Sequence, residues 1–162
     1  MTTAQVTLRS VRAQEEGRFL ELADRYFHEL SASFSPTPQW QERFLTAALD
    51  DELTRVDWII HDRREVGFTI YGWEPHRYLD RSIGKVHEFF IVPEQRDQGV
   101  GGAAARAVLA ALRRREPLRI ELEIASGNHA GLQFWDALGF RVVATRLALA
   151  NEAAGEAGGR KR

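Results

Sequence analysis

The stretch VPEQRDQGVGGA, residues 92–103, guides the interpretation of the whole chain. Its glycines Gly99, Gly101 and Gly102 stand at the start of a segment, 100–112, whose apolar residues recur at helical spacing. Glycine adopts backbone conformations closed to other residues and lets a ligand approach the main chain closely. The first N–H groups of a helix have no partner inside the helix and lie at the positive end of its dipole. The stretch therefore predicts a strand, an anion-binding loop and a helix, in that order.

These glycines have two alternative interpretations. Residues 99–104 also satisfy the dinucleotide-binding pattern G-x-G-x-x-G/A, and Glu121 stands near the position of the expected acidic residue. In that fold, however, the strand runs almost directly into the first glycine, whereas here residues 93–98 intervene. The chain after the loop is also too short for two mononucleotide-binding halves. A plain glycine-rich turn is the other alternative, and it needs fewer glycines than are present.

Hydrophobic patterns along the rest of the chain predict an α/β fold. The expected order is βααβββαβαβ, with strands at 6–11, 56–60, 66–71, 86–92, 118–125 and 140–149 and helices at 19–30, 40–49, 100–112 and 128–138. No internal repeat is present. We expect one domain over residues 1–150, followed by a disordered tail, 151–162, rich in glycine, alanine and charge.

Composition excludes several classes of function. The chain has 162 residues and no cysteine, which rules out a cysteine nucleophile or a thiolate metal site. A formal charge of -1 argues against a general nucleic-acid binder, which normally carries a basic excess. No window resembles a signal peptide or a membrane span, so we expect a cytoplasmic protein that does not bind membranes. The five histidines show no metal-ligand spacing, so no metal is expected.

Two motifs resemble those of the GNAT N-acetyltransferase superfamily. Arg96, Gly99 and Gly101 match the Q/R-x-x-G-x-G/A signature of its motif A. The sequence NHAGLQFWDALGF, residues 128–140, is similar to its motif B, in which an asparagine opens a helix and Gly-Phe closes it. The resemblance is clear from residue 86 to residue 140. Because both motifs occur in the family's order and spacing, it is specific.

The resemblance implies a mixed sheet that splays between the strands at 86–92 and 118–125, with acetyl-coenzyme A bound in the gap. The pantetheine arm would pair with the backbone near Ile91 and Val92, and Asn128 would contact it. The pyrophosphate would meet the backbone amides of the loop, beside Arg96 as a cationic partner. The implied loop residues are Arg96, Asp97, Gln98, Gly99, Val100, Gly101, Gly102 and Ala103. Asn128 also suits the N-cap of the helix that follows it.

The family's chemistry is direct attack of an amine on the thioester, in a ternary complex. Deprotonating a primary amine at pH 7 costs roughly 4 to 5 kcal/mol, so a base is useful. Glu88 matches a position where many members carry a carboxylate, and we expect it to relay the proton through water; its alternative is a surface ion pair with an arginine. Trp135 stands where many members have the tyrosine that protonates the leaving thiolate. An indole N–H is no acid at neutral pH, so water is an alternative donor and Trp135 is equally suited to packing.

The amine acceptor, a small molecule or a peptide, is not identified by the sequence. Weak candidates for substrate contacts are Tyr26, Glu29, Trp40, Tyr71, Trp73 and Glu123. Glu121 and Glu123 share one strand face, where they either bind a cationic substrate or pair with lysine or arginine. Homodimers are common in the family. A non-catalytic acyl-CoA-binding sensor on the same fold is the alternative function, motivated by Trp135.

Overall fold

The computed structural model describes residues 4–151, which form two compact parts, 4–127 and 128–151. The second part holds one helix, α4 (His129–Ala137). The first part holds the other elements, which are β1 (Val6–Ser10), the 3₁₀ turn η1 (Ala13–Glu15), α1 (Glu16–Leu30), α2 (Pro38–Leu49), β2 (Thr54–His61), β3 (Arg64–Pro75), β4 (Ser82–Ile91), the 3₁₀ turn η2 (Pro93–Gln95), α3 (Val100–Arg113) and β5 (Ile120–Leu122).

The five strands of the first part form one sheet in the order β1-β2-β3-β4-β5. The first four are antiparallel to their neighbours, and β5 lies parallel to β4. A parallel neighbour requires a crossover connection, and here α3 provides it. The expected α/β fold with a mixed sheet is therefore confirmed.

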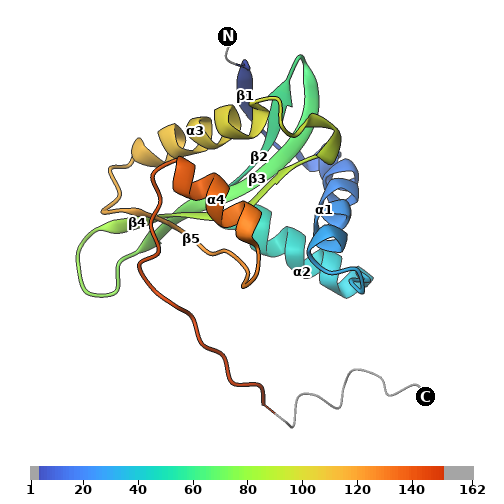
Figure 1. Cartoon of the computed structure of the whole chain (residues 1–162). Helices are drawn as coiled ribbons and strands as arrows, with labels where there is room; N and C mark the ends of the chain where they lie inside the picture. Colours follow the sequence, from blue (N-terminus) through green and yellow to red (C-terminus); the bar gives the residue numbers. More distant parts are fainter. Residues whose placement is uncertain (1–3, 152–162) are drawn as a thin grey trace. The chain divides into compact units, whose positions relative to one another are not determined.

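Helices cover both faces of this sheet (Figure 1). One core lies under α1 and α2, where Phe19 packs edge-on against Trp58 and Phe68. A second core joins α3 to the opposite face through Val100 and Ala104, which are fully buried. Strand residues alternate between the two cores because successive side chains of a strand point to opposite faces.

Strands β4 and β5 are paired over a short length. Their register covers only Gly84–Val86 and Ile120–Leu122, although β4 runs on to Ile91. The end of β4 that leads into the glycine loop therefore has no β5 partner. This arrangement agrees with the expected splay between the two strands.

A β-bulge in β4 determines which side chains face α1. Ile70 pairs with Glu88, but the next residue, Tyr71, pairs with Val86, so His87 is the extra residue. Without the bulge, Val86 and Glu88 would lie on one face. With it, Val86 shares the α3 face with Tyr71, while Glu88 shares the α1 face with Ile70. Bulges commonly redirect a side chain in this way beside functional sites.

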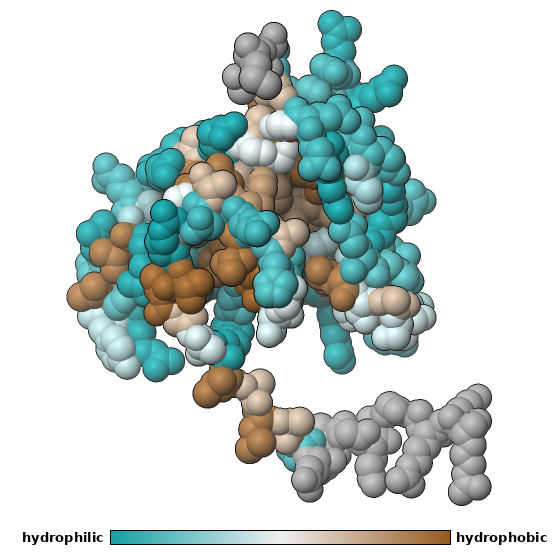
Figure 2. Space-filling model, viewed as in Figure 1, coloured by the Kyte–Doolittle hydropathy of each residue, from teal (hydrophilic) through white to brown (hydrophobic). Residues whose placement is uncertain are grey.

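The expected last strand, 140–149, is not formed. Residues 141–150 contain neither helix nor strand, and Val142, Val143, Leu147 and Leu149 are exposed. Figure 2 shows apolar side chains along this extended segment, which leads to the grey residues. A strand needs a partner for its backbone groups, and an alternating pattern alone does not supply one. Strand β5 is likewise shorter than the expected 118–125.

Two further expectations concern the C-terminal tail and membrane-spanning segments. The expected disordered tail lies outside the described residues, except for Asn151. Within residues 4–151, no helix has the length and apolar character needed to cross a membrane.

Candidate active site

The glycine loop connects β4 to α3 through a tightly folded backbone. After η2, Asp97 and Gly99 adopt left-handed conformations with φ of 59° and 76°. Gly99 is the N-cap of α3. A β-carbon at Gly99 would meet no atom within 4 Å, so the positive φ alone explains why glycine suits this position.

The start of α3 presents backbone donors that are unused within residues 4–151. Ala103 N–H donates to the Gly99 carbonyl, which is the first bond of the helix. The N–H groups of Val100, Gly101 and Gly102 have no acceptor among residues 4–151, and no side chain caps the helix. The first turn also carries no Asp or Glu. Together these groups make a site suited to an anion.

Arg106, a residue that the sequence analysis missed, adds a cation at this point. Its guanidinium nitrogen Nη2 lies 3.4 Å from the place where a β-carbon on Gly102 would be. Long side chains on a helix point back toward its N-terminus, so the spacing of four residues brings Arg106 over Gly102. The signal was available in the sequence as an arginine one turn after a glycine that leaves the space open.

Arg96 is bound to the protein in this structure. Its Nε donates to the Ile91 carbonyl at 2.9 Å, and its guanidinium pairs with Glu29 of α1 at 2.7 Å. The guanidinium also lies 5.6 Å from the centre of the Phe90 ring. Val92 N–H donates to the Val66 carbonyl of β3. A pantetheine amide at Ile91 would therefore compete with Arg96 for the same carbonyl.

Glu88 lies half-buried on the α1 face of β4, where the bulge directs it. The Tyr26 hydroxyl of α1 donates a hydrogen bond of 2.5 Å to Glu88 Oε2. Burial raises the pKa of Glu88 above its ordinary value, and the bond from Tyr26 acts in the opposite direction. Burial and the Glu88 charge together raise the pKa of Tyr26, which keeps its hydroxyl protonated. Glu88 is thus a carboxylate with a fixed orientation and an increased affinity for a proton.

Comparison with known proteins identifies the family. A model of the acetyltransferase (GNAT) family matches residues 18–140, which is most of the chain. The chain belongs to the GNAT acetyltransferase family. No curated protein sequence matches it.

Solved structures show the same fold at low sequence identity. A transcriptional regulator from Bacillus halodurans C-125 superposes with a TM-score of 0.74 at 18% identity, covering 91% of this chain and 100% of that one. A ribosomal-protein-alanine N-acetyltransferase from Brucella melitensis biovar Abortus 2308 gives 0.70 at 14% identity, covering 91% and 100%. An aminoglycoside acetyltransferase from an uncultured soil metagenomic sample, in complex with sisomicin, gives 0.69 at 14%, covering 90% and 97%.

The candidate substrate residues of this GNAT protein have different environments. Tyr71 and Trp73 are buried, and their polar groups donate to Asp57 at 2.7 Å and to the Leu112 carbonyl at 3.0 Å. Because the Tyr71 hydroxyl and the Trp73 indole N–H are bonded inside the protein, the proposed substrate site does not include these two residues. Trp40 lies between Phe27, Phe34 and Phe44 in a half-exposed aromatic group.

Strand β5 and the segment that follows it carry two carboxylates. Glu121 pairs with Lys85 at 2.8 Å and with Arg119 at 2.5 Å, so the lysine–arginine alternative holds for it. Glu123 lies beyond the end of β5 and is exposed.

In the second part of this GNAT chain, Asn128 caps α4. Its Oδ1 accepts from Gly131 N–H at 2.9 Å, and a β-carbon on Gly131 would collide with the asparagine amide. Trp135 is buried and lies edge-on to Phe134 and Phe140, with ring centres 5.0 and 5.3 Å apart. The expected N-cap at Asn128 is thus formed, and Trp135 packs against Phe134 and Phe140.

Proposed function

We propose that this GNAT protein transfers the acetyl group of acetyl-CoA to a primary amine by direct attack. The observation that carries the proposal is the start of α3, where the N–H groups of Val100, Gly101 and Gly102 have no acceptor in the described chain. Together with the Glu88 carboxylate on the adjoining strand β4, this anion site suits an acyl donor that carries phosphate groups.

The residues present fit coenzyme A. The free amides and the left-handed Gly99 form a concave backbone that accepts phosphate oxygens, and Arg106 adds a charge beside them. Beyond Val86, β4 has no β5 partner, so a pantetheine amide would pair with this edge and replace Arg96 at the Ile91 carbonyl. In this proposal Asn128 adds a contact to the pantetheine while it caps α4. Bound acetyl-CoA would supply the activated thioester.

Glu88 is proposed as the base that takes the proton from the amine, directly or through one water. Burial raises the pKa of Glu88, which narrows the gap between its proton affinity and that of an amine. Tyr26 binds Oε2, whereas Oε1 has no hydrogen-bond partner among residues 4–151. The free oxygen is therefore the one we assign to proton transfer.

The departing thiolate needs little acid catalysis. A thiol pKa of about 8.5 makes the thiolate a tolerable leaving group at neutral pH. We propose that Trp135 donates at most a hydrogen bond to the sulfur and that water provides the proton. This assigns Trp135 mainly to packing.

For the acceptor, we propose a small-molecule or peptide amine near Tyr26, Glu29, Trp40 and Glu123. A ribosomal protein and an aminoglycoside are the substrates named for two proteins of the same fold, and they represent these two classes.

The proposal further places the protein in the cytoplasm as a homodimer. Sedimentation in solution tests the dimer.

The decisive experiment measures release of free thiol from acetyl-CoA against a panel of aminoglycosides, polyamines, amino acids and peptides. We expect turnover with at least one amine, about 100-fold or more reduced in Glu88→Gln, with coenzyme A affinity unchanged. Gly101→Glu should abolish coenzyme A binding in a folded protein. Coenzyme A binding without turnover on any amine would instead favour the acyl-CoA sensor.

A further inference from the structure

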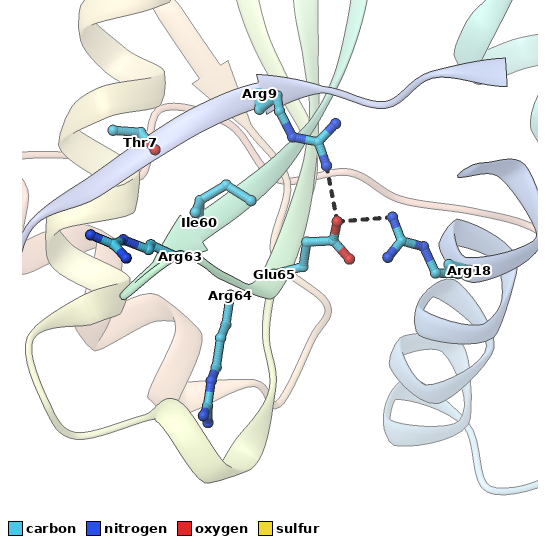
Figure 3. A pocket seen from close by; sticks show the side chains of 7 residues that line it. All are labelled: Thr7, Arg9, Arg18, Ile60, Arg63, Arg64 and Glu65. Atoms are coloured by element: carbon cyan, nitrogen blue, oxygen red, sulfur yellow. Dashed lines mark hydrogen bonds and ion pairs between the residues drawn. The ribbon is translucent and has the colours of Figure 1, made fainter. Parts of the chain in front are cut away.

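A cleft of about 490 Å³ lies beside β1, β2 and the start of β3. The hairpin end of the cleft lies at the same end of the sheet as the glycine loop, since Val92 N–H donates to the Val66 carbonyl, but the cleft is lined by other residues. Its lining includes Arg9 of β1, Arg18 of α1, Arg63 and Arg64 of the β2–β3 hairpin, and the carboxylate of Glu65. In Figure 3, Arg9 and Arg18 meet at Glu65, whereas the Arg63 and Arg64 side chains extend from the hairpin in two other directions.

One half of the cleft is held in place by ion pairs. Glu65 accepts from Arg9 at 2.9 Å and from Arg18 at 3.0 Å. Glu15 accepts from the same two arginines, at 2.9 and 2.8 Å. Each carboxylate thus bridges both guanidinium groups, and the four charges cancel. This arrangement fixes the position of Arg9 and Arg18 while leaving some of their N–H donors for another acceptor.

The other half carries two arginines, Arg63 and Arg64, that have no ion-pair partner in the described part of the chain. The side chains of Arg63 and Arg64 have no hydrogen bond or ion pair with any of residues 4–151, and both are exposed. With the four bridged groups neutral as a set, the cleft has an excess of two positive charges. Two unpaired guanidinium groups that line the same cleft as two fixed ones suit an acceptor with several oxygens, because a guanidinium binds such groups through two N–H donors.

The hairpin that presents these arginines is strained. His61 and Arg64 are paired, and the two residues between them, Asp62 and Arg63, have φ of 48° and 63°. Two-residue hairpins of this kind favour glycine at the second position, because a β-carbon is disfavoured at positive φ. Arginine therefore stands where a smaller residue would fold more easily. Strain of this kind is typical of positions retained for function.

We propose that this cleft binds a phosphate dianion carried on a small molecule, independently of acetyl transfer. The dianion would match the excess of two charges, with Arg63 and Arg64 as its main partners. The volume falls within the roughly 300 to 1,000 Å³ usual for small-ligand sites. None of the residues that line the cleft belongs to the glycine loop or to α3.

Titration calorimetry on the full chain tests the site, with inorganic phosphate and glycerol phosphate as probes. The measurements are made at pH about 8, above the second phosphate pKa of about 6, and at constant ionic strength. All are done in the Gly101→Glu background, so that phosphate bound at the cofactor loop does not contribute. We expect one saturable site. Tighter binding of glycerol phosphate than of inorganic phosphate would identify an ester as the ligand, and the reverse would identify the free ion.

Two variants separate the site from nonspecific charge. Arg63→Gln/Arg64→Gln should weaken binding about tenfold or more, whereas Arg43→Gln/Arg113→Gln, with the same change in charge, should leave it unchanged. Arg63→Gly should weaken binding while keeping or increasing thermal stability, because glycine relieves the positive φ. Equal losses in both double variants, or no saturable binding in the Gly101→Glu background, would overturn the proposal.

Discussion

The contact between Tyr26 and Glu88 is the side-chain interaction most directly linked to the proposed chemistry. The Tyr26 bond lowers the pKa of Glu88 against the effect of burial. Removing the hydroxyl in Tyr26→Phe should therefore raise that pKa further, so that Glu88 becomes an unprotonated base only at higher pH. We expect the acidic limb of the kcat–pH profile to move to higher pH. Turnover at neutral pH should fall about tenfold, with the KM for acetyl-CoA unchanged.

Tyr78→Phe provides the matched control for this prediction. It removes the same hydroxyl from an exposed tyrosine, whose hydroxyl has no hydrogen-bond partner among residues 4–151. Its pH profile should coincide with that of the wild type. A Tyr26→Phe profile that also coincides, in an active enzyme, would show that the contact is purely structural.

Arg106 is the residue whose role in cofactor binding depends most on the structure. Arg106→Ala should raise the Kd for coenzyme A about tenfold, because it removes a charged partner of the phosphates. The stability of the protein should change little, since Arg106 is exposed and has no ion pair within residues 4–151. Calorimetry with coenzyme A measures the effect. Arg113→Ala, at the opposite end of α3, is the control and should bind normally; equal affinities in both variants would remove Arg106 from the site.

Trp135 tests how far the family's chemistry applies. If its indole only packs or donates one neutral hydrogen bond, Trp135→Phe should reduce turnover by about tenfold or less. Trp135→Tyr should be tolerated and should gain activity if its phenol, of pKa about 10, reaches the thiolate. Steady-state rates check both. A thousandfold loss in a stable Trp135→Phe variant that still binds coenzyme A would contradict this account.

Among the elements, α1 is the one that links the proposed substrate and cofactor regions. Arg25 of α1 pairs with Glu94 of η2 at 2.9 Å, and Glu29 of α1 pairs with Arg96 at 2.7 Å. Both pairs are largely exposed, so each contributes little to stability. Their effect is to place α1, and with it Tyr26, at a defined position beside the loop.

Backbone conformation predicts that alanine has opposite effects on stability at Gly17 in α1 and at Gly99, the N-cap of α3. A methyl group at Gly17 or at Gly99 would meet no atom within 4 Å. Gly17→Ala should increase the free energy of unfolding by about 0.4 to 1 kcal/mol, because alanine suits a helix better. Gly99→Ala should decrease it by about 1 to 2 kcal/mol, because φ is 76° there. Denaturant unfolding measures both, and a stabilising Gly99→Ala would contradict the left-handed assignment.

For the molecule as a whole, Glu15 makes the fold sensitive to acid. Its bonds to the Arg9 side chain and the Arg12 backbone N–H lower its pKa from 4.5 to about 2. A lowered pKa in the folded state stabilises the protein above the unfolded value, and this contribution is lost as the pH falls from about 4.5 toward 2. Glu15→Gln should be less stable at neutral pH and should show a flatter pH dependence in this window. Thermal unfolding of this variant beside Glu21→Gln, an exposed control, measures the difference.

The sequence alone predicted most of the secondary structure and the position of the glycine loop between strand and helix. The positive φ at Gly99 and the unpaired donors at the start of the apolar helix are local properties, which a short stretch of sequence can indicate. Both motifs of the resemblance led to the family that was then identified. The sequence also predicted the strand on which Glu88 lies. The β-bulge changes the sheet face to which Glu88 points, but it does not change the strand.

Tertiary structure alone decided which side chains meet. Tyr26 and Glu88 are 62 residues apart in sequence, and only the packing of α1 on β4 brings them together. The same applies to Arg9, Arg18 and Glu65, which come from three elements. Burial of Tyr71 and Trp73, and the absence of a strand at 140–149 in the described chain, depend likewise on partners distant in sequence. Local patterns fix conformation, whereas pairing and burial depend on long-range contacts that no single segment contains.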